Sequence, residues 1–88
     1  MPDVGQRWIA YLQTQPEWRC IFTGSSEVDC CHLRHGSNKD DLQVFPATHE
    51  FHMQIHTEGA RFWTPVRLGD LWEWIEKQFQ LWENFKEE

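Results

Sequence analysis

The sequence predicts a small α+β protein, and three observations support this. Apolar residues recur at helical spacing near both ends of the chain, in residues 3–14 and 70–86. The middle of the chain carries two short strand-like runs followed by a third helical segment. The chain has 88 residues, which is the size of one domain, and we place that domain at residues 1–88.

The two outer segments are expected to be amphipathic helices. Asp3 is suited to cap the first helix, and Pro16 follows its end. Asp70 is the expected N-cap of the second helix, with Glu73 at the capping-box position. The apolar surface of residues 70–86 is wider than one core-facing side requires. We therefore expect a homodimer contact or another protein partner there, with simple packing as the alternative.

The middle of the chain, residues 18–63, is expected to form a ββα unit. The first strand is predicted over residues 27–33 and the second over residues 42–45, with a polar loop between them. Pro46 suits a helix entrance, Thr48 is an acceptable N-cap, and Gly59 marks the end of the helix.

All five histidines lie within residues 29–56, and this clustering indicates a metal site. His52 and His56 are four residues apart, so they share one face of a helix and can bind the same divalent cation. His49 extends that stripe by one turn. Strand alternation places Cys31 and His32 on opposite faces of the first strand. The alternative is an exposed polar face that is merely rich in histidine.

The order of these features resembles that of the ββα-metal (HNH, or His-Me finger) endonucleases. The shared features are a strand histidine, a polar loop, a short strand, Pro46, the pair His52 and His56, and then Gly59 with a Phe-Trp pair. The sequence looks most like the small prophage-type nucleases and the recombination-enhancement nucleases of that superfamily. The resemblance covers about residues 18–63.

The resemblance implies a function for several residues. His32 would be the general base that takes a proton from the attacking water, a role for which a neutral imidazole is suited. His52 and His56 would hold one divalent ion, Mg²⁺ or Mn²⁺ for activity, with Zn²⁺ as a further candidate. The implied reaction is metal-dependent hydrolysis of DNA phosphodiester bonds.

The third metal ligand differs from the family pattern and stays open between Cys31 and Asp29. Cysteine thiolates favour zinc over the hard magnesium ion. Many relatives also carry a structural zinc knuckle, of which this chain keeps one ligand. We expect no zinc knuckle here, and packing of Phe22 and Phe51 in its place; the four matching positions are Cys20, Thr23, Thr48 and Phe51.

The charge of the chain restricts its partners. Its formal net charge of −6 predicts that DNA binds weakly, with strong salt dependence and without sequence preference. The polar residues beside the proposed base are candidates for phosphate or auxiliary metal contacts. These residues are Arg34, His35, Asn38, Lys39 and His49.

Other features of the sequence predict where the protein is located and which alternative functions it could have. Three cysteines and the lack of a signal peptide or membrane segment predict a cytoplasmic protein with no membrane partner. One alternative function is a non-catalytic HNH-like module that binds metal or another protein. A further alternative is a structural zinc site made by Cys31, His52 and His56.

Overall fold

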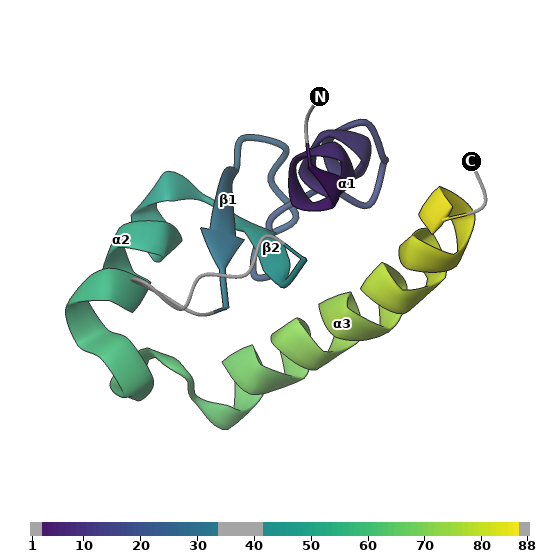
Figure 1. Cartoon of the computed structure of the whole chain (residues 1–88). Coiled ribbons are helices and arrows are strands. Elements are labelled where there is room, and N and C mark those ends of the chain that lie inside the picture. Colours follow the sequence, from purple (N-terminus) through teal and green to yellow (C-terminus); the bar gives the residue numbers. More distant parts are fainter. Residues whose placement is uncertain (1–2, 34–41, 87–88) are drawn as a thin grey trace.

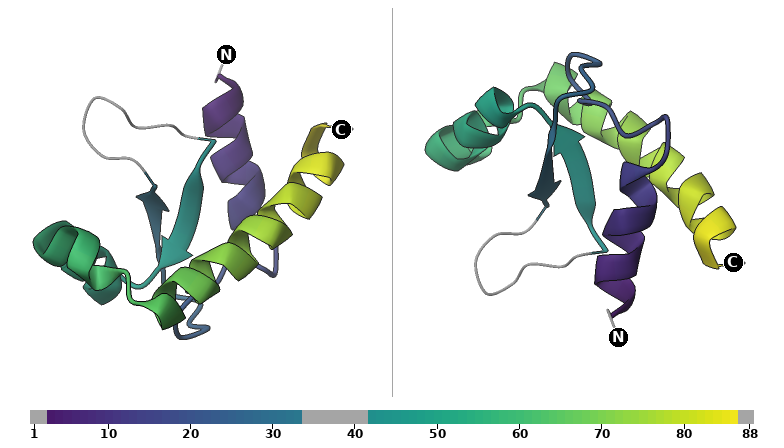
Figure 2. Two further views of the ribbon diagram at one scale, coloured as in Figure 1. Left: turned by 90° about the horizontal axis from the view of Figure 1, so that it is seen from below. Right: turned by 90° about the horizontal axis from the view of Figure 1, so that it is seen from above.

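Two short strands pair with each other and stand between helices on both sides. The computed structural model describes residues 3–33 and 42–86. Helix α2 lies on one side of the strands, and helices α1 and α3 lie on the other (Figure 1, Figure 2). This arrangement confirms the α+β prediction. The elements are α1 (Val4–Gln13), β1 (Asp29–His32), β2 (Val44–Ala47), α2 (His49–Glu58), the 3₁₀ helix η2 (Gly59–Phe62) and α3 (Pro65–Lys86).

The strands β1 and β2 are antiparallel. Asp29 is opposite Ala47, and His32 is opposite Val44. Strand β2 was expected over residues 42–45, but it begins at Val44 and includes Pro46, which was expected at a helix entrance. Proline has no backbone N–H to donate. It fits here because Pro46 lies between the hydrogen bonds that join β1 and β2, where no N–H is needed.

Helices α1 and α2 begin and end where the sequence predicts. The carboxylate of Asp3 accepts a hydrogen bond from the N–H of Gln6 at 2.8 Å, which caps α1. The hydroxyl of Thr48 accepts the N–H of Phe51 at 3.4 Å, and α2 ends at Gly59, whose φ is 60°. This positive φ favours glycine.

Helix α3 begins at Pro65, and the predicted start at Asp70 is wrong. The hydroxyl of Thr64 accepts the N–H of Arg67 at 3.3 Å, so Thr64 caps the first turn. Pro65 then occupies the first helical position, where its fixed φ is favourable and its N–H is not needed. Asp70 therefore lies inside the helix.

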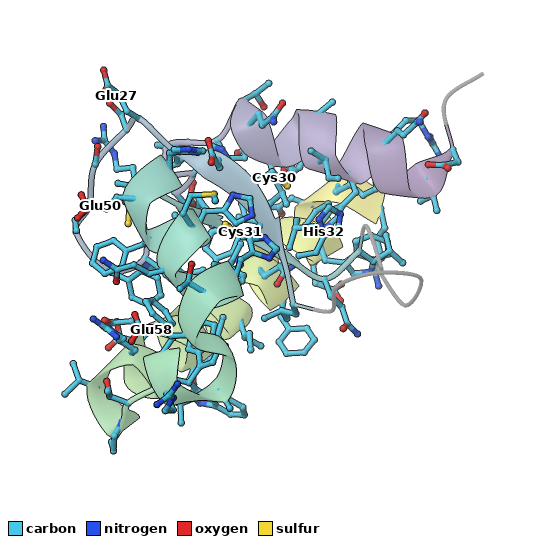
Figure 3. All side chains as sticks on the ribbon, turned by 90° about the vertical axis from the view of Figure 1, so that its left-hand side faces the viewer. Glu27, Cys30, Cys31, His32, Glu50 and Glu58 are labelled. Carbon is cyan, nitrogen blue, oxygen red and sulfur yellow. The ribbon has the colours of Figure 1, made fainter. Side chains whose placement is uncertain are left out.

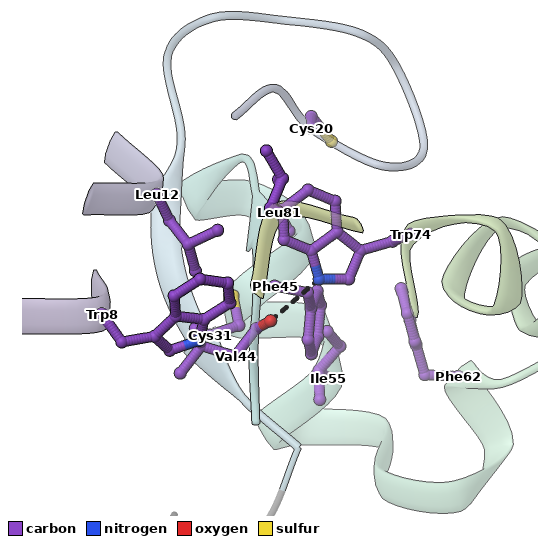
Figure 4. Packing of buried hydrophobic residues seen from close by; sticks show 11 residues of the cluster. Trp8, Leu12, Cys20, Cys31, Val44, Phe45, Ile55, Phe62, Trp74 and Leu81 are labelled. Atoms are coloured by element: carbon purple, nitrogen blue, oxygen red, sulfur yellow. Dashed lines mark hydrogen bonds between the residues drawn. The ribbon is translucent and has the colours of Figure 1, made fainter. Parts of the chain in front are cut away.

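The hydrophobic core lies where the strands meet the three long helices (Figure 4). Trp8 of α1 packs against Trp82 and Phe85 of α3, at ring-centroid distances of 5.1 and 5.2 Å. Trp74 of α3 donates its indole N–H to the carbonyl oxygen of Val44 at 2.9 Å. The two ends of the chain therefore pack on the ββα unit. The buried apolar residues are Trp8, Leu12, Cys20, Cys31, Val44, Phe45, Ala47, Ile55, Phe62, Trp74 and Leu81.

Candidate metal centre

One carboxylate of β1 contacts two imidazoles of α2. Oδ2 of Asp29 lies 2.7 Å from Nδ1 of His49 and 3.0 Å from Nδ1 of His52. Each of these residues offers one ligand atom, and the three atoms lie within 4.8 Å of one another. A carboxylate with two imidazoles is a donor set that divalent cations bind. The site therefore fits a divalent ion.

A third imidazole of α2 adjoins this cluster. Nε2 of His56 lies 3.1 Å from Nε2 of His52, and the two ring centroids are 4.8 Å apart. The rings are tilted and lie one turn apart along α2, as the spacing of four residues requires. Contacts of Asp29 and His52 thus join four side chains, and we call Asp29, His49, His52 and His56 the metal-site cluster.

The local structure explains how these residues come together. Thr48 caps α2, so His49 is the first residue of the helix and His52 follows one turn later on the same face. Ala47 ends β2 immediately before that cap, and its partner across the sheet is Asp29. The strand register therefore brings the carboxylate of Asp29 to the N-terminus of α2.

The hydrogen bonds of Asp29 also govern its electrostatics. The contact with His52, followed by the contact with His49, lowers the pKa of the Asp29 carboxyl below its ordinary value. The N-terminus of a helix also favours a negative charge, and Asp29 contacts α2 in its first turn. The carboxylate is therefore ionised near neutral pH and can act as an acceptor or a metal ligand. The site is open to solvent, since the side chain of His49 is 75% exposed.

The structure brings Asp29, and not Cys31, to the imidazoles. Cys31 is 1% exposed and belongs to the hydrophobic core. Burial, with a smaller contribution from neighbouring Cys30, raises the pKa of the Cys31 thiol to about 12. Among the described residues, Cys31 is not one of those whose ligand atoms converge with the imidazoles, which argues against a zinc site made by Cys31, His52 and His56.

The proposed base, His32, is the last residue of β1. It is partly buried and lies about 10 Å along the strand from Asp29, given about 3.3 Å per residue. Among the described residues, it is not one of those whose ligand atoms converge on one point. The other candidate contacts, Arg34, His35, Asn38 and Lys39, lie outside the described residues.

The positions that match a zinc knuckle also meet in space. Burial alone would raise the pKa of the Cys20 thiol, but hydrogen bonds with the Thr23 hydroxyl and the backbone of Thr48 lower it below the ordinary value. The rings of Phe22 and Phe51 pack with their centroids 5.0 Å apart. This contact confirms the packing that the sequence predicts for the two phenylalanines.

Acidic side chains lie near the start of β1 and on α2. Glu27 precedes β1, and Glu50 and Glu58 lie in the first and last turns of α2 (Figure 3). Acidic groups favour a cation and oppose a nucleic acid. None of the described helices is long and apolar enough to cross a membrane.

His49 was expected to be an auxiliary residue, but the structure places it in direct contact with Asp29. Its spacing of three residues from His52 is the signal that identifies this role, because residues three apart share a helix face. No known family, curated protein or solved structure matches the chain.

Proposed function

We propose that this protein is a metal-dependent endonuclease that hydrolyses DNA phosphodiester bonds. The observation that carries this proposal is the contact of Asp29 on β1 with the histidines of α2, inside a ββα unit. Nothing in a small hydrophobic core requires a carboxylate and three imidazoles to gather on one exposed face. Binding of a divalent cation would account for this arrangement.

The metal-site cluster would hold the cation. Its nitrogen and carboxylate donors suit Zn²⁺ and Mn²⁺, while Mg²⁺ prefers oxygen ligands and retains its water molecules. When bound, the ion would polarise a phosphoryl oxygen and stabilise the charge that develops on the leaving oxygen.

His32 is the residue that we assign as the general base. In the resemblance to the ββα-metal endonucleases, the strand histidine takes the proton from the attacking water. His32 is partly buried at the end of β1. The net charge of −6 supports weak, salt-dependent binding of DNA rather than a tight complex.

A plasmid-nicking assay at low salt tests this function. Wild-type protein with Mg²⁺, Mn²⁺ or Zn²⁺ should nick supercoiled plasmid, and EDTA should stop the reaction. His32→Ala should slow cleavage by about 10²- to 10⁴-fold, the usual contribution of a general base, and keep its metal affinity. Met53→Ala is the matched control, because Met53 is an exposed residue of the same α2 helix. A wild-type protein that is inactive with all three metals would exclude the nuclease.

A non-catalytic protein-interaction module is the second candidate. The observation that favours it is the exposure of aromatic side chains on α3, where Trp72 is 63% and Phe79 is 69% exposed. Phe79 also lines a largely apolar groove of about 460 Å³ with Trp8 and Ile75. Exposed aromatic residues beside an apolar groove are common at protein interfaces. This candidate predicts metal binding without nicking.

A further inference from the structure

We propose that Asp29 acts as a positioning residue outside the coordination sphere of the metal. In this view its carboxylate orients the ring of His52, so that Nε2 of His52 and Nε2 of His56 face the same ion. The inference rests on the proposed metal site, but it does not depend on cleavage of DNA. It concerns which atoms of the metal-site cluster bind the cation.

The contacts of Asp29 have the lengths of direct hydrogen bonds. At 2.7 and 3.0 Å, Oδ2 of Asp29 accepts hydrogen bonds from Nδ1–H of His49 and from Nδ1–H of His52. A neutral imidazole that donates through Nδ1 carries its lone pair on Nε2. The contact with Asp29 therefore selects Nε2 of His52 as the atom that can bind a metal.

The position of His56 agrees with this selection. Two nitrogens that each bind an ion at about 2.0–2.1 Å lie about 2.8–3.4 Å apart, for angles between octahedral and tetrahedral. The observed hydrogen-bonded separation of the Nε2 atoms of His52 and His56 is 3.1 Å. This separation lies within that range, so the two nitrogens can bind one ion. Carboxylates that orient a metal-binding histidine through its second nitrogen are a general feature of metal sites.

His49 contacts the same carboxylate oxygen of Asp29, Oδ2, at 2.7 Å. The carboxylate is about one-third exposed, and this second contact adds to the restraint that His52 provides. We assign His49 the role of restraining Asp29.

The same cluster offers a competing site, in which Asp29, His49 and His52 bind the ion directly. The two sites share His52 and differ in the other ligands. In the competing site His56 is not required, whereas Asp29 and His49 are both ligands. In the proposed site His56 is required, and the carboxylate needs only to accept a hydrogen bond. Variants of these residues therefore separate the two.

The test measures Zn²⁺ and Mn²⁺ affinity by calorimetry for the full chain and its variants. Asp29→Asn keeps an oxygen acceptor and should bind the metal within about 10-fold of wild type, while Asp29→Ala should lose about 10- to 100-fold. His56→Ala should bind more weakly than either Asp29 variant. Met53→Ala is the control, and circular dichroism confirms that each variant is folded.

Nitrogen-15 NMR of the imidazoles gives a readout that a purely structural role would not change. On addition of Zn²⁺, the resonance of Nε2 of His52 should shift as that of a metal-bound nitrogen, while Nδ1 keeps the shift of a protonated nitrogen. Metal binding through Nδ1 of His52 would overturn the proposal. So would a His56→Ala variant with wild-type affinity together with loss of binding in Asp29→Asn and His49→Ala. Absence of metal binding by wild type would instead exclude the proposed function itself.

Discussion

The indole N–H of Trp74 donates to the carbonyl oxygen of Val44 at 2.9 Å, across the outer edge of β2. One turn later in α3, the side-chain amide of Gln78 donates to the carbonyl of Leu42 at 3.0 Å. The N–H of Ile21 donates to the carbonyl of Pro46 at 3.1 Å. The carbonyls of Val44 and Pro46 lie on the outer edge of β2, and that of Leu42 lies two residues before the strand. These three carbonyls are therefore satisfied by groups from elsewhere in the chain.

This relationship predicts different costs for two similar substitutions. Trp74→Phe should leave the carbonyl of Val44 buried without its partner, which adds about 1–3 kcal/mol to the loss of packing. In Trp8→Phe the deleted N–H is itself buried and has no partner among the described residues, so its removal offsets part of the packing loss. Urea denaturation of the two variants tests the comparison. Equal losses of unfolding free energy would show that the Val44 contact contributes nothing.

The buried thiol of Cys31 predicts a loss of stability in alkali. Its pKa of about 12 in the folded protein lies above the ordinary value of 9.0. The folded protein therefore retains a proton that the unfolded chain releases above pH 9.0, and stability falls by about 1.4 kcal/mol per pH unit in that range. Below pH 9.0 the thiol is protonated in both the folded and the unfolded chain, so this loss of stability does not occur there.

Comparison with Cys31→Ala isolates this effect, because the other titrating groups are shared. Chemical denaturation should give a constant difference in unfolding free energy between the two proteins below pH 9.0. The difference should shrink between pH 9.0 and about 11. A constant difference throughout would mean that the thiol titrates alike in the folded and unfolded chains.

Cation binding at the metal-site cluster should stabilise the fold. A ligand at about 100 times its Kd adds about 2.7 kcal/mol, which corresponds to a rise in Tm of roughly 10 °C or more for a chain of this size. Thermal unfolding with Zn²⁺ or Mn²⁺ should show this rise, and EDTA should reverse it. His52→Ala should abolish the rise because His52 joins Asp29 to His56, whereas Met53→Ala should keep it.

The two faces of α3 should differ in their tolerance of substitution. Leu81 is 4% exposed, so Leu81→Ala should cost about 2–5 kcal/mol of unfolding free energy. Phe79 is mostly exposed, and Phe79→Ala should change stability by less than about 0.5 kcal/mol. Denaturation of dilute protein tests both values. A large loss in Phe79→Ala that grows with protein concentration would show that this face is covered by a second copy.

Local signals in the sequence were sufficient to predict α1 and α2. Asp3 and Thr48 cap the helices as expected, and Gly59 ends α2. Two equally good local signals compete at the start of α3. Asp70 has the capping pattern, but Thr64 followed by Pro65 provides a cap and a first helical residue earlier in the chain. Local chemistry alone does not decide between them.

The candidate site could be predicted only in part, because local spacing identifies some of its residues and strand register decides the others. The spacing of His52 and His56 identifies one helix face without knowledge of the fold. The choice between Asp29 and Cys31 depends on strand register, which is a non-local property. Once Asp29 pairs with Ala47, the carboxylate meets α2 and Cys31 enters the core. A shift of one residue would move both side chains to the other face of the sheet.

The covering of β2 by α3 also has a consequence for protein synthesis. The ribosome synthesises the chain from its N-terminus, so residues 29–58 are made before Trp74 and Gln78 are added. A nascent chain that ends before Trp74 carries all four side chains of the metal-site cluster, yet the carbonyls of Leu42 and Val44 still lack their partners on α3. The side chains of the metal-site cluster are thus translated before the α3 groups that pair with these two carbonyls.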